Sequence, residues 1–138
     1  MPDASCNLEL LPGLLTICRL PPGEPVPDWA WGGDFAAVVR TPAELSIVCP
    51  EGRPPAGARQ EPGWRALAVA GPLDFHQVGV LASLAGPLAA AEVSIFVVST
   101  FDTDYLLLRA RDLPRALAAL AGAGHRISQP AGEALHPA

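Results

Sequence analysis

The sequence contains no lysine, and its nine basic residues are all arginine. Charged residues make up only 17% of the chain, and the formal net charge is −5. A protein that binds nucleic acid through the phosphate backbone needs a basic surface, so this composition argues against nucleic acid as a partner. Together with many alanines, prolines and glycines, the exclusive use of arginine is typical of a GC-rich bacterial genome.

A long apolar run and a basic leader are missing as well. No apolar stretch approaches the roughly 18–20 residues that a helix needs to span a bilayer. The N-terminus, Met1-Pro2-Asp3, has neither the basic residues nor the apolar segment of a secretory signal. Half of the residues are hydrophobic, so the chain can still fold around a core. We therefore expect a folded, cytoplasmic protein with no membrane partner.

Groups that hold metals or perform catalysis are few. The three cysteines show neither a CxxC motif nor pairing with histidine at zinc-like spacing, which favours reduced, buried thiols. His76, His125 and His136 are scattered, so we expect surface or capping roles for them. Ser99 and Cys49 lack the sequence context of an activated nucleophile, such as G-x-S-x-G. We expect no metal, no cofactor and no enzymatic activity.

The second half of the sequence has the clearer pattern. Arg65–Ala70 is short and apolar and predicts a strand. Asp74 and Gln77 then form a capping-box pattern, which predicts that a helix starts there. Pro87 lies further along and is expected to kink or shorten the last turns of this helix. The apolar residues at helical spacing predict a buried stripe of Val78, Leu81, Leu84, Ala85 and Leu88.

The same half continues with two strands, a helix and a short strand. Val93–Val98 and Tyr105–Leu108 are apolar and predict strands. Asp112 is expected to cap a second helix with Pro114 in its first turn, and Arg126–Ser128 predicts a brief last strand. The resulting order, β-α-β-β-α-β, is the split βαβ or ferredoxin-like plan.

The first half repeats part of this plan in a degenerate form. Val38–Thr41 echoes Val97–Thr100, but the intervening stretches are rich in proline and glycine and lack apolar periodicity. Thr41-Pro42-Ala43-Glu44 has a capping-box pattern with room for one helical turn. We therefore expect an α+β fold of two tandem repeats, with antiparallel sheets that carry helices on one face. The expected divisions are a degenerate N-terminal repeat at 1–63, a second repeat at 64–128 and a flexible tail at 129–138.

The predicted strands of the second repeat are apolar on both faces. Two helices can cover only one face of that sheet, and the other face needs a second cover. Burying a few hundred Å² there is worth roughly 5–10 kcal/mol before entropy is subtracted. We expect the first repeat, a second copy of the chain, or both to provide this cover, so a homodimer is a physical expectation.

The turn between the two apolar strands gathers polar groups. Residues 99–104, Ser-Thr-Phe-Asp-Thr-Asp, place hydroxyls, one ring and two carboxylates between buried strands. A carboxylate accepts hydrogen bonds from an ammonium group, and the helix start at Asp74–Gly79 can bind a carboxylate through free amides. The two segments predict a pocket for a zwitterion. The alternatives are an ordinary hairpin turn and capped helix, or a DxD metal site that is short of oxygen ligands.

Residues 73–108, which include this turn, resemble a family of small bacterial tandem ACT proteins and the metazoan CASTOR arginine sensors. The resemblance extends over about residues 64–127 and, less closely, over residues 8–50. ACT domains are regulatory modules that bind small ligands, commonly amino acids, between paired domains. A CASTOR chain holds four ACT repeats and this chain about two, so the resemblance also implies a homodimer.

The resemblance further implies which residues line the ligand pocket. The turn and the helix start of one subunit form one wall, and two residues of the partner subunit complete it. The implied ligand-binding residues are Thr100, Phe101, Thr103, Asp104, Phe75, Gln77, Gly79, Val80, Ser94 and Ile95. The implied ligand is an amino acid, either arginine or another.

We therefore expect a regulatory sensor protein that binds an amino acid-type ligand in a homodimer and passes its occupancy to a protein partner. The alternative is a ligand-free interaction or assembly module, in which the turn is purely structural. An enzyme is a third class, but we find no convergent set of nucleophile, base and metal that it would need.

Overall fold

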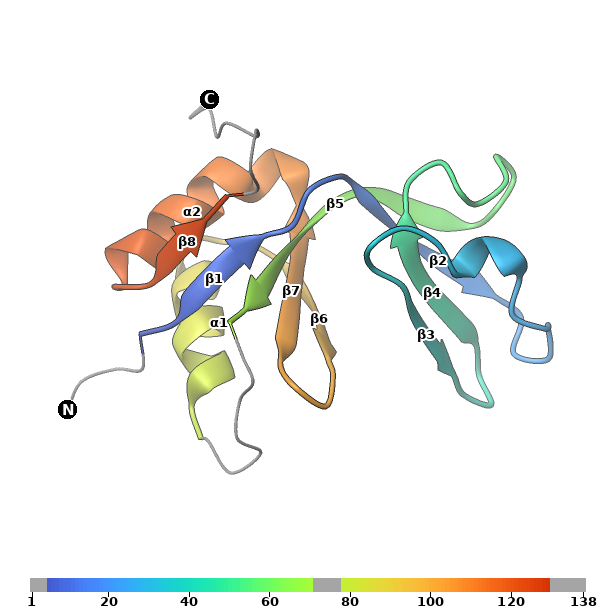
Figure 1. Ribbon diagram of the computed structural model, residues 1–138, viewed down its shortest axis with the longest axis horizontal. Helices are drawn as coiled ribbons and strands as arrows, with labels where there is room; N and C mark the ends of the chain where they lie inside the picture. Colours follow the sequence, from blue (N-terminus) through green and yellow to red (C-terminus); the bar gives the residue numbers. More distant parts are fainter. Residues whose placement is uncertain (1–4, 71–77, 130–138) are drawn as a thin grey trace. The chain divides into compact units, whose positions relative to one another are not determined.

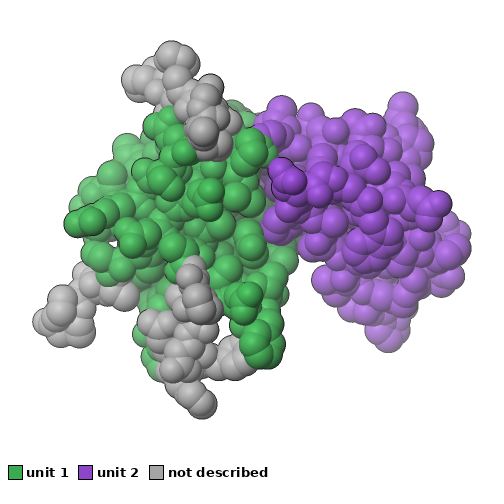
Figure 2. Space-filling view, viewed as in Figure 1, with its two compact units in different colours: residues 1–12, 65–138 green, residues 13–64 purple. Residues whose placement is uncertain are grey.

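A computed structural model describes residues 5–70 and 78–129 and divides the chain into two compact units (Figures 1 and 2). The inserted unit comprises residues 13–64, and the main unit comprises the segments on either side of it. The second boundary falls inside strand β5 (Gln60–Val69). The sequence-based division assigns all of residues 1–63 to the first repeat, whereas in the structure the first described strand, Asn7–Leu10, belongs to the main unit.

The inserted unit is an antiparallel sheet. Its strand order is β3-β4-β2-β5, with β2 at Leu15–Leu20, β3 at Ala37–Arg40 and β4 at Leu45–Pro50. A short 3₁₀ helix, η1 (Asp28–Ala30), is the one helical element in this fully described range. The proline- and glycine-rich stretches that lack apolar periodicity thus form no α-helix within residues 13–64. The core of this unit contains Cys18, Ala30, Leu45, Ile47 and Cys49.

The main unit has a five-stranded sheet in the order β6-β7-β5-β1-β8. Its other elements are β1 (Asn7–Leu10), α1 (Val80–Ala90), β6 (Ile95–Ser99), β7 (Asp104–Arg109), η2 (Ala110–Asp112), α2 (Leu113–Gly122) and β8 (Arg126–Ser128). From β5 to β8 the order is the predicted β-α-β-β-α-β, so this expectation is confirmed. Strand β1 was not foreseen in this sheet: it pairs antiparallel with β5 and parallel with β8.

Both helices of the main unit pack on one face of its sheet (Figure 1). Side chains alternate between the faces of a strand, and every second strand residue points to the helices. The helices bury Leu84, Leu88, Ala116 and Leu120 against this face. Each fully buried leucine contributes about 1.5–3 kcal/mol to stability. The strand residues on the helix side are Leu8, Leu10, Leu67, Val69, Leu106 and Leu108.

Helix α1 begins later than the sequence predicts. Gly79 precedes the helix with φ of 88°, a left-handed conformation that interrupts a right-handed helix, and Val80 is the first helical residue. The expected capping residues, Asp74 and Gln77, lie outside the described residues. The predicted stripe is partly wrong, because Val78 is 94% exposed and Leu81 is 37% exposed. The helix buries Leu84 and Leu88, as predicted, together with Val80.

Pro87 lies inside α1 without ending it. Proline has no backbone N–H, so it cannot donate the helical hydrogen bond to the carbonyl oxygen four residues earlier, that of Ser83. The His125 ring lies 2.9 Å from this oxygen through Nε2, and its Nδ1 accepts a hydrogen bond of 3.0 Å from the backbone N–H of Cys6. His125 is only 5% exposed. The expected surface role for His125 is therefore wrong.

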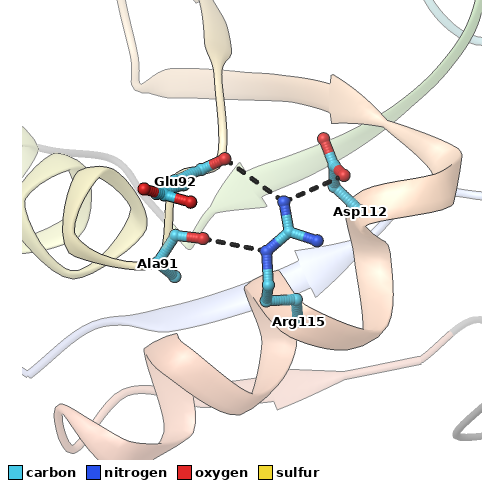
Figure 3. A network of polar contacts seen from close by, with 4 residues as sticks. All are labelled: Ala91, Glu92, Asp112 and Arg115. Atoms are coloured by element: carbon cyan, nitrogen blue, oxygen red, sulfur yellow. Dashed lines mark hydrogen bonds and ion pairs between the residues drawn. The ribbon is translucent and has the colours of Figure 1, made fainter.

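A polar network joins the end of α1 to the start of α2 (Figure 3). Arg115 donates through Nε to the Ala91 carbonyl at 2.8 Å and through Nη2 to the Glu92 carbonyl at 3.2 Å. The same Nη2 contacts Asp112 Oδ1 at 3.1 Å. Asp112 was expected to cap α2 with its side chain, but it makes no such bond and pairs with Arg115 instead. The cation thereby binds the carbonyl end of α1.

Candidate ligand-binding site

The turn between β6 and β7 is held by its own side chains. Ser99 and Asp104 are register partners at the ends of the two strands, and Ser99 Oγ donates to Asp104 Oδ1 at 2.7 Å. Within the turn, the Thr100 N–H donates to the Thr103 carbonyl at 2.8 Å, and the Thr103 N–H donates to Thr100 Oγ1 at 3.2 Å. These bonds fix the shape of the turn before any ligand is bound.

Thr103 connects the turn to the neighbouring strand. Its hydroxyl donates to the Val69 carbonyl at the end of β5, over 2.7 Å. Strand β5 lies between β7 and β1 in the sheet, so this bond holds the turn close to the middle strand of the main unit. Asp104 Oδ1 and the hydroxyl hydrogen of Thr103 therefore already have protein partners. The second Asp104 oxygen and the lone pairs of the Thr103 hydroxyl can still accept hydrogen bonds.

An open cleft of about 400 Å³ lies in the main unit next to this turn. Glu9, Ala68 and Tyr105 contribute to it from the sheet face opposite the helices, because their strand neighbours point into the core. Glu9 and Ala68 are register partners on β1 and β5. The full lining is Glu9, Ala68, Val69, Ala70, Asp102, Thr103 and Tyr105. Two carboxylates, one aromatic residue and small alanines make a volume suited to a small ligand that carries a cation.

The structure brings only part of the predicted site into this cleft. Thr103 lines it, whereas Thr100 and Phe101 lie on the exposed side of the turn, with Phe101 80% exposed. Asp104 is half-buried and bonded to Ser99.

The helix-start residues of the predicted site bond within α1. The Gly79 carbonyl accepts from the Ser83 N–H at 2.9 Å, and the Val80 carbonyl accepts from Ser83 Oγ at 2.7 Å. The side chain of Val80 packs in the core. Phe75 and Gln77 lie outside the described residues.

Ser94 and Ile95, which the resemblance assigns to the partner subunit's wall, lie at the start of β6. Ser94 is exposed, and Ile95 pairs with Leu108 while its side chain packs at the border of the core. Among the described strands, β6 pairs with β7 alone. Its outer edge is therefore open as far as residues 5–70 and 78–129 are concerned.

Sequence reasoning missed Glu9 and Tyr105 as residues of the cleft. The alternation in Leu8-Glu9-Leu10 was a usable signal, because two buried leucines place the residue between them on the other face. The pairing of β1 with β5 carried no local signal. Without that pairing, nothing in the sequence links Glu9 to a turn more than ninety residues later.

The inserted unit contains a matching turn between β3 and β4, whose residues do not line the cleft of the main unit. Thr41 donates through its N–H to the Glu44 carbonyl at 2.9 Å, and its hydroxyl accepts from the Glu44 N–H at 3.2 Å. Residues 41–44, whose capping-box pattern left room for only one helical turn, connect β3 to β4 as a hairpin turn. The register leaves no room for a helix, since Arg40 and Leu45 already face each other.

The described residues give no sign of a metal centre or a reactive thiol. Within them, no group of three or more His, Cys, Asp or Glu side chains is arranged to hold a metal ion. All three cysteines are buried and free. Burial, with a smaller contribution from the neighbouring Cys49, raises the pKa of the Cys18 thiol from 9.0 to about 11. A thiol protonated at neutral pH is a poor nucleophile.

Comparison with known proteins places this arrangement in a family. The ACT domain family model matches residues 59–122, and a second model, described as an N-terminal domain, matches residues 13–56. Residues 59–122 of this chain form an ACT domain. The protein Atu0741 from Agrobacterium tumefaciens, solved by crystallography, is 40% identical with a TM-score of 0.90, covering 97% of this chain and 100% of that one.

Two further similarities concern regulatory proteins. Human cytosolic arginine sensor for mTORC1 subunit 1 is 46% identical over 46 residues, which is 33% of this chain and 14% of the sensor. The chain thus spans about a seventh of the length of the curated relatives it matches. The regulatory subunit of aspartate kinase from Thermus thermophilus has a TM-score of 0.60 at 13% identity, covering 90% of this chain and 99% of that one. At that identity the likeness shows the ACT fold alone.

Neither helix in the described residues is long and apolar enough to cross a membrane.

Proposed function

We propose that this ACT-domain protein is a regulatory sensor that binds an amino acid-type ligand in the cleft beside the β6–β7 turn. The observation that carries the proposal is that Glu9 and Asp102 both line one cleft of about 400 Å³, together with Thr103 and the end of β5. A ligand ammonium or guanidinium group fits between the carboxylates, since charge-assisted hydrogen bonds are the strong ones in proteins. The named role of the human relative in sensing arginine supports a ligand of this class.

The ligand carboxylate requires donors, which the acidic cleft does not provide. The start of α1 after Gly79 offers backbone N–H groups that a helix leaves without intrahelical partners. In this proposal they bind the carboxylate, together with Phe75 and Gln77 of the preceding segment. Thr100, Phe101 and Asp104 then form the outer part of the turn over the ligand.

The proposed assembly is a homodimer formed through β6. Residues 95–98 of this strand carry no charge, while edge strands in monomeric proteins are usually protected by lysine, proline or bulges. Two copies of β6 in antiparallel register extend both sheets and bring Ser94 and Ile95 of one copy toward the turn of the other. In this proposal the protein is cytoplasmic and non-catalytic, and it acts on a protein partner through ligand occupancy.

The first experiment is a thermal-shift screen of the twenty free amino acids. A ligand present at about a hundred times its Kd stabilises the folded protein by about 2.7 kcal/mol. The substitutions Glu9→Gln and Asp102→Asn should each weaken binding by about tenfold or more, because each removes a charge-assisted hydrogen bond. Glu24→Gln is the matched control, since Glu24 is an exposed carboxylate of the inserted unit. The absence of any shift rejects the proposed function, and an unchanged shift in the Glu9→Gln/Asp102→Asn variant rejects this cleft.

The competing function is a ligand-free assembly module. It is favoured by the internal bonds of the turn, where Ser99 binds Asp104 and Thr103 binds Val69 without a ligand. This alternative predicts the same dimer with no amino acid response. A stable dimer in sedimentation, together with a negative screen, would select it.

A further inference from the structure

The hydrogen-bonding role of each nitrogen of His125 is fixed by its surroundings. The Ser83 carbonyl lacks a helical donor because Pro87 has no N–H, and His125 Nε2 lies 2.9 Å from that oxygen. The carbonyl can only accept, so Nε2 carries the proton. On the other side, the backbone N–H of Cys6 can only donate, so Nδ1 at 3.0 Å is bare. Both bonds exist together only when the ring is neutral.

This ring connects the segments that form the proposed ligand site. Cys6 leads directly into β1, which carries Glu9 to the cleft. Ser83 lies in the first turn of α1, and its N–H and hydroxyl bind Gly79 and Val80. The Arg126 N–H donates to the Cys6 carbonyl at 3.0 Å, which joins β8 to the same point. We name His125 with its partners Cys6 and Ser83 the His125 junction.

We propose that the His125 junction is a proton-sensitive device that sets the position of β1 and of the start of α1, and thereby regulates ligand binding. Protonation places a hydrogen on Nδ1 directly opposite the Cys6 N–H, so one hydrogen bond is replaced by two facing donors. Histidine is the side chain that ordinarily changes charge between about pH 5 and pH 8. The step is a protonation alone and requires no other reactant.

The elements packed around the ring offer little to compensate a positive charge. Helix α1 contains no ionisable residue, and Cys6, which precedes β1, contacts the ring through its backbone N–H. Glu9 points to the opposite sheet face. On α2 the charged side chain is Arg115, which binds α1 carbonyls and Asp112, and on β8 it is the exposed Arg126. Neither of these side chains is a carboxylate that could pair with a protonated ring.

Nuclear magnetic resonance can observe this ring alone. The full chain with His76→Gln and His136→Gln keeps His125 as its single histidine. At pH 7.5 we expect ¹⁵N signals of a neutral ring protonated at Nε2. Between pH 7.5 and 5.0 the protection factor of the Cys6 amide should fall at least about tenfold. The matched variant adds His125→Gln, which offers a donor and an acceptor without titrating, and its protection factor should change less than about twofold.

Three results would overturn the device: a proton on Nδ1 at pH 7.5, Cys6 protection that is independent of pH, or an equal fall in the His125→Gln chain. If His125→Gln does not fold, His125→Asn provides the non-titrating comparison. The ring tautomer in the single-histidine chain decides the geometry without either variant.

The regulatory part rests on the proposed function, and a second measurement separates the two. The twenty free amino acids are screened by thermal shift at pH 7.5 and 5.0 on the single-histidine chain and on its His125→Gln form. We expect about tenfold weaker binding at pH 5.0 only where His125 is present. Equal weakening in both chains rejects regulation by this ring. If no amino acid binds at either pH, the proposed function fails, while the resonance experiment still decides whether the junction senses protons.

Discussion

Thr41 and Thr100 occupy the same position in two hairpin turns of equal length. Each donates its N–H to the carbonyl three residues later, and each hydroxyl accepts the N–H of that later residue, Glu44 or Thr103. The echo seen in the sequence before these threonines is therefore a structural repeat at the hairpins. The two turns differ at their last residue, since Thr103 extends a hydroxyl to a neighbouring strand and Glu44 has no hydroxyl to offer.

The repeated turn leads to a first prediction. Thr100→Val keeps the shape of the side chain but removes the hydroxyl, so the free energy of unfolding should fall by about 1 kcal/mol. Thr100→Ser keeps the hydroxyl and should be close to wild type. Thr41→Val tests the same bond in the inserted unit and should cost a similar amount. Urea unfolding measures all three, and a Thr100→Ser chain as unstable as Thr100→Val contradicts the role of the hydroxyl.

A second prediction concerns Pro87 and His125. His125→Leu leaves the Ser83 carbonyl and the Cys6 N–H without these partners and should cost about 2–4 kcal/mol. In a Pro87→Ala background, residue 87 regains an N–H for the Ser83 carbonyl, so the same substitution should cost about 1 kcal/mol less. The double-mutant cycle by urea unfolding gives this coupling directly. Additivity within about 0.3–0.5 kcal/mol would contradict the shared carbonyl.

A third prediction uses the strained residue after α1. Glu92 has φ of 61°, the left-handed region that costs a non-glycine residue roughly 1–2 kcal/mol. Glu92→Gly should therefore stabilise the fold by about 1 kcal/mol, because the bond from Arg115 reaches the Glu92 backbone carbonyl and is retained. Glu92→Ala keeps the strain and serves as the control. Equal midpoints of urea unfolding for the glycine and alanine chains would show that the strain is absent in solution.

A fourth prediction comes from the Cys18 pKa, which burial raises from 9.0 to about 11. The folded state holds this proton more tightly than the unfolded chain, so the stabilisation is complete below pH 9 and is lost as the pH rises toward 11. The free energy of unfolding should fall by roughly 1–2 kcal/mol across that range. With no lysine in the sequence, few other groups titrate there. Cys18→Ala should flatten the pH dependence relative to wild type.

The fold was predictable from the sequence where the signals are local. The strand and helix order from β5 to β8 is evident from apolar periodicity and from turn residues. The predicted start of α1 is too early. The capping pattern at Asp74 favours an early start in the sequence, but the left-handed φ of Gly79 makes the helix begin at Val80. The capping-box pattern at Thr41 is ambiguous in a similar way, since the same hydrogen bonds also stabilise a hairpin turn.

The candidate site was less predictable because its parts are distant in sequence. Thr103 is identifiable from the turn, but Glu9 enters through the pairing of β1 with β5. The role of His125 is invisible in the sequence because a single histidine carries no periodic signal. Its partner carbonyl is left without a helical donor by Pro87, which by itself predicts only a kink. Such pairs become visible only when the backbone donors and acceptors are counted in three dimensions.

The position of β1 also governs how the protein is made. This strand precedes both of its neighbours in the chain, which end at Val69 and Ser128. At translation rates of roughly 5–20 residues per second, its second neighbour emerges about 6–24 s later. The edge of β1 that faces β8 stays unpaired until then, and its pairing closes a long loop from Asn7 to Arg126. Synthesis therefore completes the inserted unit, residues 13–64, before it supplies β8 to the sheet of the main unit.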